Sequence, residues 1–104
     1  MKTIPLKTVT DTTPGQPETE FDYARVMITI LTGANPQGLT IEDMRKRMRI
    51  ADALEAGQKT GECELEDADY IYLIQIIRGH RWPRAFEAAI QMEDDLKKAG
   101  GQAD

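Results

Sequence analysis

The segment Tyr70–Ile77 constrains the fold of this 104-residue chain most, because every residue in it except Gln75 is apolar. By residue preference alone the segment could be a strand. Acidic residues precede it and Arg78-Gly79 follows it, which is typical of the start and end of a helix, so we predict a helix over residues 67–78. A helix that is apolar on all sides must be buried on all sides, either as the central element of the protein or in a subunit interface.

The interface alternative defines a set of candidate contact residues. A domain of this length buries only about two-thirds of the surface that its unfolded chain exposes, so a partner subunit would add to a thin core. We therefore expect the protein to bind a second copy of itself or another protein. The candidate interface residues are the large apolar side chains of this segment and the tryptophan beyond it: Tyr70, Leu73, Ile74, Ile77 and Trp82.

The helix predicted over residues 41–56 has the clearest local signals. Thr40 and Asp43 approximate a capping box, with Asp in place of the usual Glu or Gln. The spacing of the apolar residues places one group on one face of the helix and a second group toward another side. Other parts of the protein could therefore cover more than one face of this helix. The first group is Ile41, Met44, Met48 and Ala51, and the second is Ile50 and Leu54.

Two weaker segments complete a set of four helices. Residues 21–31 are mostly apolar, and Gly33 beyond them suits a left-handed C-cap. Residues 84–98 have one apolar side, and Pro83 can occupy the first turn of that helix. We predict an all-α or mostly α fold, a compact bundle of about four helices with room for a minimal two-stranded β pairing.

The rest of the chain divides into short segments. Residues 1–20 are rich in Thr, Pro and Gly and are typical of a flexible arm, with a short strand compatible with residues 3–9. Glu62–Leu65 alternates polar and apolar residues and could pair with that strand. We expect a single helical domain over residues 21–99 and a disordered tail over residues 100–104.

No arrangement of residues indicates catalysis, a metal site or a cofactor. Gly33 and Gly38 have the spacing of phosphate-loop glycines but lack the following Lys-Ser/Thr. Cys63 and His80 are the only cysteine and histidine that could serve as nucleophile and base, and no sequence pattern indicates that they lie close together in the fold. One cysteine and one histidine cannot build a standard zinc site, and the acids of residues 62–69 lack the glycine and glutamate positions of a calcium loop. We predict that the protein is not an enzyme and has no cofactor and no metal.

A basic cluster over residues 78–84 is the best candidate binding site. Net charge is −5, which argues against a general nucleic-acid binder, although a local patch can still bind phosphates. Three interpretations remain: a nucleic-acid contact, a protein interface, and an Arg-rich turn in which Trp82 covers the core. The candidate nucleic-acid contacts are Arg78, Arg81 and Arg84.

The N-terminal residues, the length of the apolar runs and the cysteine content predict where in the cell the protein is found. The N-terminal residues lack the apolar core and cleavage site of a signal peptide, and no apolar run is long enough to span a membrane. A single cysteine cannot form an intramolecular disulfide. We expect a cytoplasmic protein of a host cell, with association with a virion as an alternative, and no membrane partner.

Residues 39–95 resemble a group of small tailed-bacteriophage proteins of uncharacterised function. The resemblance lies in Met48–Leu54, in Leu65–Tyr70, and in Arg81-Trp82 before an amphipathic helix. It implies a phage or prophage origin and a compact helical domain, and it supplies no catalytic residue. We therefore expect a non-enzymatic phage or prophage protein that acts through protein–protein interaction in assembly or regulation. The alternative is a nucleic-acid-binding regulator that uses the cluster at residues 78–84.

Overall fold

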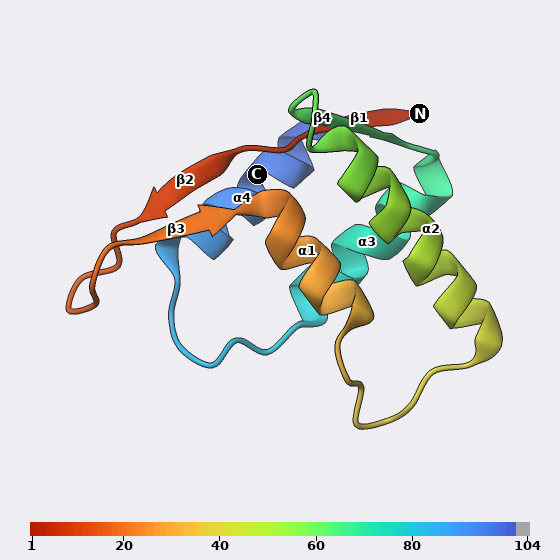
Figure 1. The fold of residues 1–104 in the computed structure, drawn as a ribbon, viewed down its shortest axis with the longest axis horizontal. Helices are drawn as coiled ribbons and strands as arrows, with labels where there is room; N and C mark the ends of the chain where they lie inside the picture. The colour runs from red at the N-terminus through yellow and green to blue at the C-terminus, as the bar shows by residue number, and fades with distance from the viewer. Residues whose placement is uncertain (102–104) are drawn as a thin grey trace.

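The computed structural model describes residues 1–101, in which helices and short strands form a mixed structure (Figure 1). Within these residues the helices are α1 (Tyr23–Thr32), α2 (Ile41–Gly57), α3 (Asp67–Gly79) and α4 (Glu87–Ala99). The strands of the same region are β1 (Lys2–Pro5), β2 (Thr8–Asp11), β3 (Thr19–Asp22) and β4 (Glu62–Leu65).

The predicted helices and the β pairing are confirmed in this described region. The segment Tyr70–Ile77 lies in a helix, α3, and not in a strand. The Thr40 hydroxyl accepts a hydrogen bond from the Asp43 backbone N–H at 3.0 Å, so the predicted cap of α2 forms. The fold is nevertheless richer in strands than we predicted, because residues 1–101 contain two small antiparallel sheets instead of one pairing.

The two sheets use the segment that the sequence assigned to an arm. β1 pairs with β4, with Ile4 opposite Cys63, and β2 pairs with β3, with Val9 opposite Phe21. The single strand suggested over residues 3–9 is therefore two strands that belong to different sheets. Ile4 is fully buried, which makes β1 part of the core.

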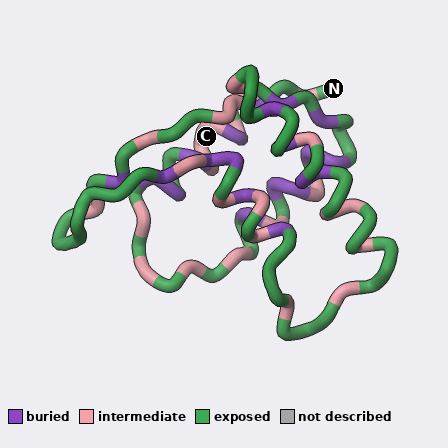
Figure 2. The backbone as a smooth tube through the Cα atoms, in the orientation of Figure 1, coloured by how far each residue is buried: buried purple, intermediate pink, exposed green. Residues whose placement is uncertain are grey.

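The core lies where the helices face one another and the strands. Figure 2 shows the buried positions gathered toward the interior, with exposed positions along the outer edge of α2. The Tyr70 hydroxyl donates a hydrogen bond to the Leu96 carbonyl at 2.5 Å and so links α3 to α4 inside the core. The Tyr23 hydroxyl donates to Asp95 Oδ2 at 2.6 Å and links α1 to the same helix.

The side chains of α3 that we proposed as interface residues belong to this chain's own core. Tyr70, Leu73, Ile74 and Ile77 are each at most 5% exposed. The helix is not buried on all sides, however, because Ile71 remains 51% exposed. The apolar character of the segment is thus largely explained by burial within one chain.

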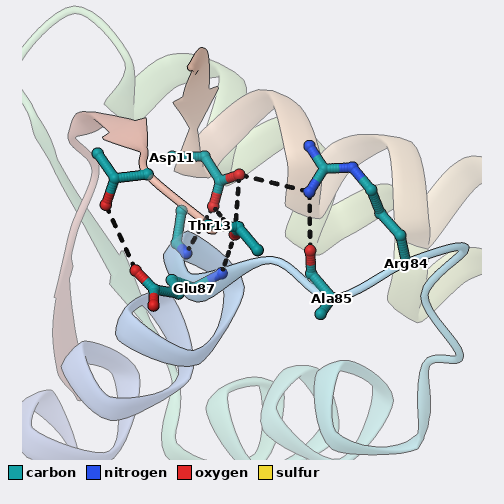
Figure 3. A network of polar contacts seen from close by, with 7 residues as sticks. Asp11, Thr13, Arg84, Ala85 and Glu87 are labelled. Atoms are coloured by element: carbon teal, nitrogen blue, oxygen red, sulfur yellow. Dashed lines mark hydrogen bonds and ion pairs between the residues drawn. The ribbon is translucent and has the colours of Figure 1, made fainter. Parts of the chain in front are cut away.

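Helix α4 begins three residues later than we predicted, so Pro83 lies before the helix and not in its first turn. The backbone N–H groups of that first turn are capped by side chains that are distant in sequence. Phe86 precedes the helix in an extended conformation and offers no side-chain cap. The carboxylate of Asp11, which is fully buried, accepts a hydrogen bond from the Ala88 backbone N–H at 3.1 Å. The Thr13 hydroxyl accepts from the Glu87 N–H at 2.9 Å, so the end of β2 and the loop after it satisfy two free donors of α4 (Figure 3).

The C-terminal end of α4 is the last part that the structure describes. The Gly100 backbone N–H donates to the Leu96 and Lys97 carbonyls, which ends the helix. The predicted disordered tail covers residues 100–104, of which 102–104 lie outside the described residues.

Acid should destabilise the protein, because the pKa values of three carboxyl groups, Asp11, Asp67 and Asp69, lie below their ordinary value in the folded chain. Arg49 donates to both oxygens of Asp69 at 2.9 and 2.6 Å, which outweighs burial and holds the pKa of Asp69 below its ordinary value of 3.8. Burial alone would raise the pKa of Asp11, but the Ala88 N–H, Thr13 and Arg84 bring it below 3.8 as well.

The direction in which stability changes with pH follows from the difference in proton binding between the folded and unfolded chains. Groups with a depressed folded pKa contribute stability that is complete above the unfolded pKa and is lost as the pH falls through the folded pKa. We expect the melting temperature to decline from about pH 4 downward in thermal unfolding followed by circular dichroism. Asp69→Asn should lower the melting temperature near neutral pH and make the acid decline shallower. An equally steep decline in this variant would contradict the assignment.

Candidate functional site

The arginines of the cluster at residues 78–84 do not form one basic face. Arg78 pairs with Glu93 of α4 at 3.2 Å. Arg84 pairs with the buried Asp11 at 3.5 Å and also donates to the Ala85 carbonyl at 2.7 Å (Figure 3). Arg81 makes no ion pair or hydrogen bond with another described residue, so it alone offers an uncompensated charge.

Trp82 belongs to an aromatic group that covers the edge of the core. Its ring lies 6.2 Å from Phe21 and 5.9 Å from Phe86, measured between centroids, and 4.8 Å from the ring of His80. The guanidinium of Arg84 lies 3.8 Å from the centre of the Phe86 ring. These contacts favour the third of the sequence interpretations, an arginine-rich turn in which Trp82 covers the core.

Arg81 and His80 lie on a groove that the sequence analysis did not find. The groove has a volume of about 750 Å³ and lies between the end of α1, the α1–α2 loop, Arg47 of α2 and the end of α3. Its polar lining includes Thr29, Asn35, Gln37, Arg47, Gln75, His80 and Arg81, and no Asp or Glu is among the described lining residues. We call this feature the basic groove.

Two basic residues of α2, Arg47 and Arg49, lie close together in sequence but have different partners in the structure. Arg49 pairs with Asp69 of α3 at 2.6 Å. Arg47 instead donates through Nη1 to the Leu31 carbonyl at 3.3 Å. Its Nε is buried and has no hydrogen-bond partner among residues 1–101.

The outer face of α2 carries three of the five large apolar side chains that are exposed on helices of the described chain. Ile41, Met44 and Met48 are 63%, 43% and 51% exposed and follow one another at helical spacing. The buried side of α2 is instead formed by Ile50, Ala51, Leu54 and Gly57. The first apolar group that we identified in the sequence is therefore mainly the outer one, and we call Ile41, Met44 and Met48 the α2 stripe.

Charged side chains lie beside the α2 stripe. Arg45, Asp52 and Glu55 are exposed and recur at the same helical spacing as the stripe. Within residues 1–101 none of these three forms an ion pair with another side chain. The face therefore combines exposed apolar groups with charges of both signs that remain available to a partner.

The lone thiol is poorly suited to nucleophilic chemistry. Cys63 is 2% exposed, and burial together with the neighbouring Glu64 charge raises its pKa to about 11. A thiol with so high a pKa is almost entirely protonated at neutral pH. Among residues 1–101 no group of three or more His, Cys, Asp or Glu side chains is placed to hold a metal ion.

Comparison with known proteins assigns no family. No protein-family model, curated protein or solved structure matches the chain. In the part of the chain that the structure describes, every helix is too short or too polar to cross a membrane.

Proposed function

We propose that this chain is a small, non-enzymatic phage or prophage protein that acts through protein–protein interaction in assembly or regulation, and that its first partner is a second copy of itself. The phage origin rests on the resemblance of residues 39–95. The observation that supports an interaction role is the α2 stripe, because large apolar side chains grouped on one exposed helix face are typical of a contact surface. Methionine suits such surfaces because its flexible side chain adapts to different partners.

The charges beside the stripe favour a second copy as the occupant. Arg45 and Asp52 are equally far in sequence from the midpoint between Met48 and Arg49. Two copies of α2 that pack antiparallel about a two-fold axis at that midpoint therefore place Arg45 of each opposite Asp52 of the other. A two-fold interface must be complementary to itself, and the Arg45–Asp52 pairing meets that condition in charge.

The nucleic-acid alternative has less support. Two of its three proposed contacts, Arg78 and Arg84, are already in ion pairs with Glu93 and Asp11. Releasing them to bind phosphate would leave the buried carboxylate of Asp11 without its counter-charge.

Self-association should be lost when a charge is placed in the α2 stripe. In sedimentation velocity at roughly 100 µM, we expect the wild-type chain to form a dimer and Met48→Glu to remain a monomer, because an unpaired carboxylate would be desolvated in the contact. Ile90→Glu is the matched control, since Ile90 is 64% exposed on α4 and lies outside this face. A wild-type protein that stays monomeric, or equal dimerisation of the two variants, would refute the proposed contact.

A further inference from the structure

The basic groove has a charge distribution unlike that of the chain as a whole. The chain has 18 acidic residues against 13 basic ones, yet the described lining of the groove contains Arg47, Arg81 and His80 and no acid. Positive charge concentrated in a concave site without compensating carboxylates raises the local concentration of anions. The groove is thus a place where this acidic protein attracts negative charge.

The two arginines of the groove lack a negative partner. Arg47 is held to α1 by its bond to the Leu31 carbonyl, while its buried Nε has no partner among the described residues. Neither arginine forms an ion pair with a described residue, and a guanidinium without a carboxylate partner leaves its charge uncompensated. Arg81, which is exposed, comes from the segment after α3 on another part of the same groove.

The remaining lining indicates the size and character of a ligand. Ile30, Pro36 and Ile76 supply apolar surface, and Thr29, Asn35 and Gln75 supply hydrogen-bonding groups. A volume of about 750 Å³ lies within the range of small-molecule sites. A few polar groups within a partly apolar concave surface are typical of such sites.

We propose that the basic groove binds a small organic anion through a phosphate or carboxylate group, which Arg47 and Arg81 hold while the apolar lining contacts the rest of the ligand. Guanidinium groups suit this role because their N–H donors match the oxygens of phosphate and carboxylate. The site is separate from the α2 stripe, so the proposal does not depend on self-association.

The test is a titration of the full chain followed by amide chemical shifts in NMR, at constant ionic strength. The probes are inorganic phosphate, adenosine monophosphate and citrate, which separate phosphate from carboxylate recognition and show whether an organic part adds affinity. We expect saturable shifts for at least one probe, centred on residues 33–37 and 79–81. Shifts that do not saturate, or that spread over the whole surface, would overturn the proposal.

Substitutions then locate the site. Arg81→Gln should weaken the affinity of the probe that binds by about tenfold or more, because it removes a charge-assisted contact from an exposed side chain that the fold does not use. Arg47→Gln should weaken it as well, with a thermal melt to check that the fold persists. Arg25→Gln is the matched control, since Arg25 is exposed on α1 and does not line the groove. Unchanged affinity in Arg81→Gln, or an equal loss in Arg25→Gln, would contradict a specific site.

Discussion

Replacing Gly57 with alanine should lower the free energy of unfolding by about 2 kcal/mol, although alanine is the better helix former. Gly57 is the last residue of α2 and lies against β4. A Cβ atom there would lie 2.5 Å from the Glu62 carbonyl oxygen and 2.9 Å from Leu6 Cδ1. Because the first of these contacts is with backbone, a small side-chain rotation cannot relieve it, and the helix end must move away from the sheet.

Urea denaturation followed by circular dichroism measures this effect. Gly79→Ala is the matched control, since Gly79 also ends a helix but a Cβ there would meet no atom within 4 Å. We expect the control to be unchanged in stability or more stable by less than about 1 kcal/mol. Equal stabilities for the two variants would show that Gly57 and the backbone of Glu62 do not lie as close together as in the structure.

Replacing Asp11 with alanine should lower the melting temperature by roughly 10 °C. The substitution removes the acceptor of the Ala88 N–H, the partner of the Thr13 hydroxyl and the counter-charge of Arg84 at once (Figure 3). The first turn of α4 would lose one of its two side-chain caps, and the end of β2 would lose its attachment to the helix. Differential scanning calorimetry gives the shift directly.

Asp11→Asn serves as the control for this prediction. Its amide oxygen can still accept from the Ala88 N–H, but it carries no charge to pair with Arg84, so we expect an intermediate melting temperature. Hydrogen exchange should then show reduced protection at the start of α4 in Asp11→Ala and less reduction in Asp11→Asn. A melting temperature for Asp11→Ala within a degree or two of the wild type would contradict the capping role.

The helices and β4 could be predicted because their signals are local. The cap at Thr40, the acids that precede α3 and the alternation of Glu62–Leu65 are all read within a few residues. For α1, however, the end of the helix was predicted correctly while the reason given for it was wrong. We expected Gly33 to adopt a left-handed conformation after α1, but its φ is −73°. A Cβ there would lie 2.9 Å from the Thr29 carbonyl oxygen, so close approach accounts for the glycine instead.

The features of the candidate sites were hidden because they depend on contacts between distant residues. The sequence of α2 has two apolar groups, and only the packing of α2 against α1 and β4 decides that Ile50 and Leu54 are buried while Met48 is exposed. Asp11 lies 77 residues from the Ala88 that it caps, so no local pattern identifies it. The basic groove likewise joins Arg47 to Arg81, which are separated by the whole of β4 and α3.

Oxidative cross-linking of a Met48→Cys variant tests most directly whether the outer face of α2 joins two copies of the chain. In the antiparallel arrangement, residue 48 of each copy lies next to the two-fold axis, so a disulfide between copies should form readily. The native thiol should not interfere, since Cys63 is buried and its pKa is raised to about 11. We predict a covalent dimer for Met48→Cys under mild oxidation and a monomer for the control Ile90→Cys. A monomer for both variants, or equal cross-linking of both, would contradict the account.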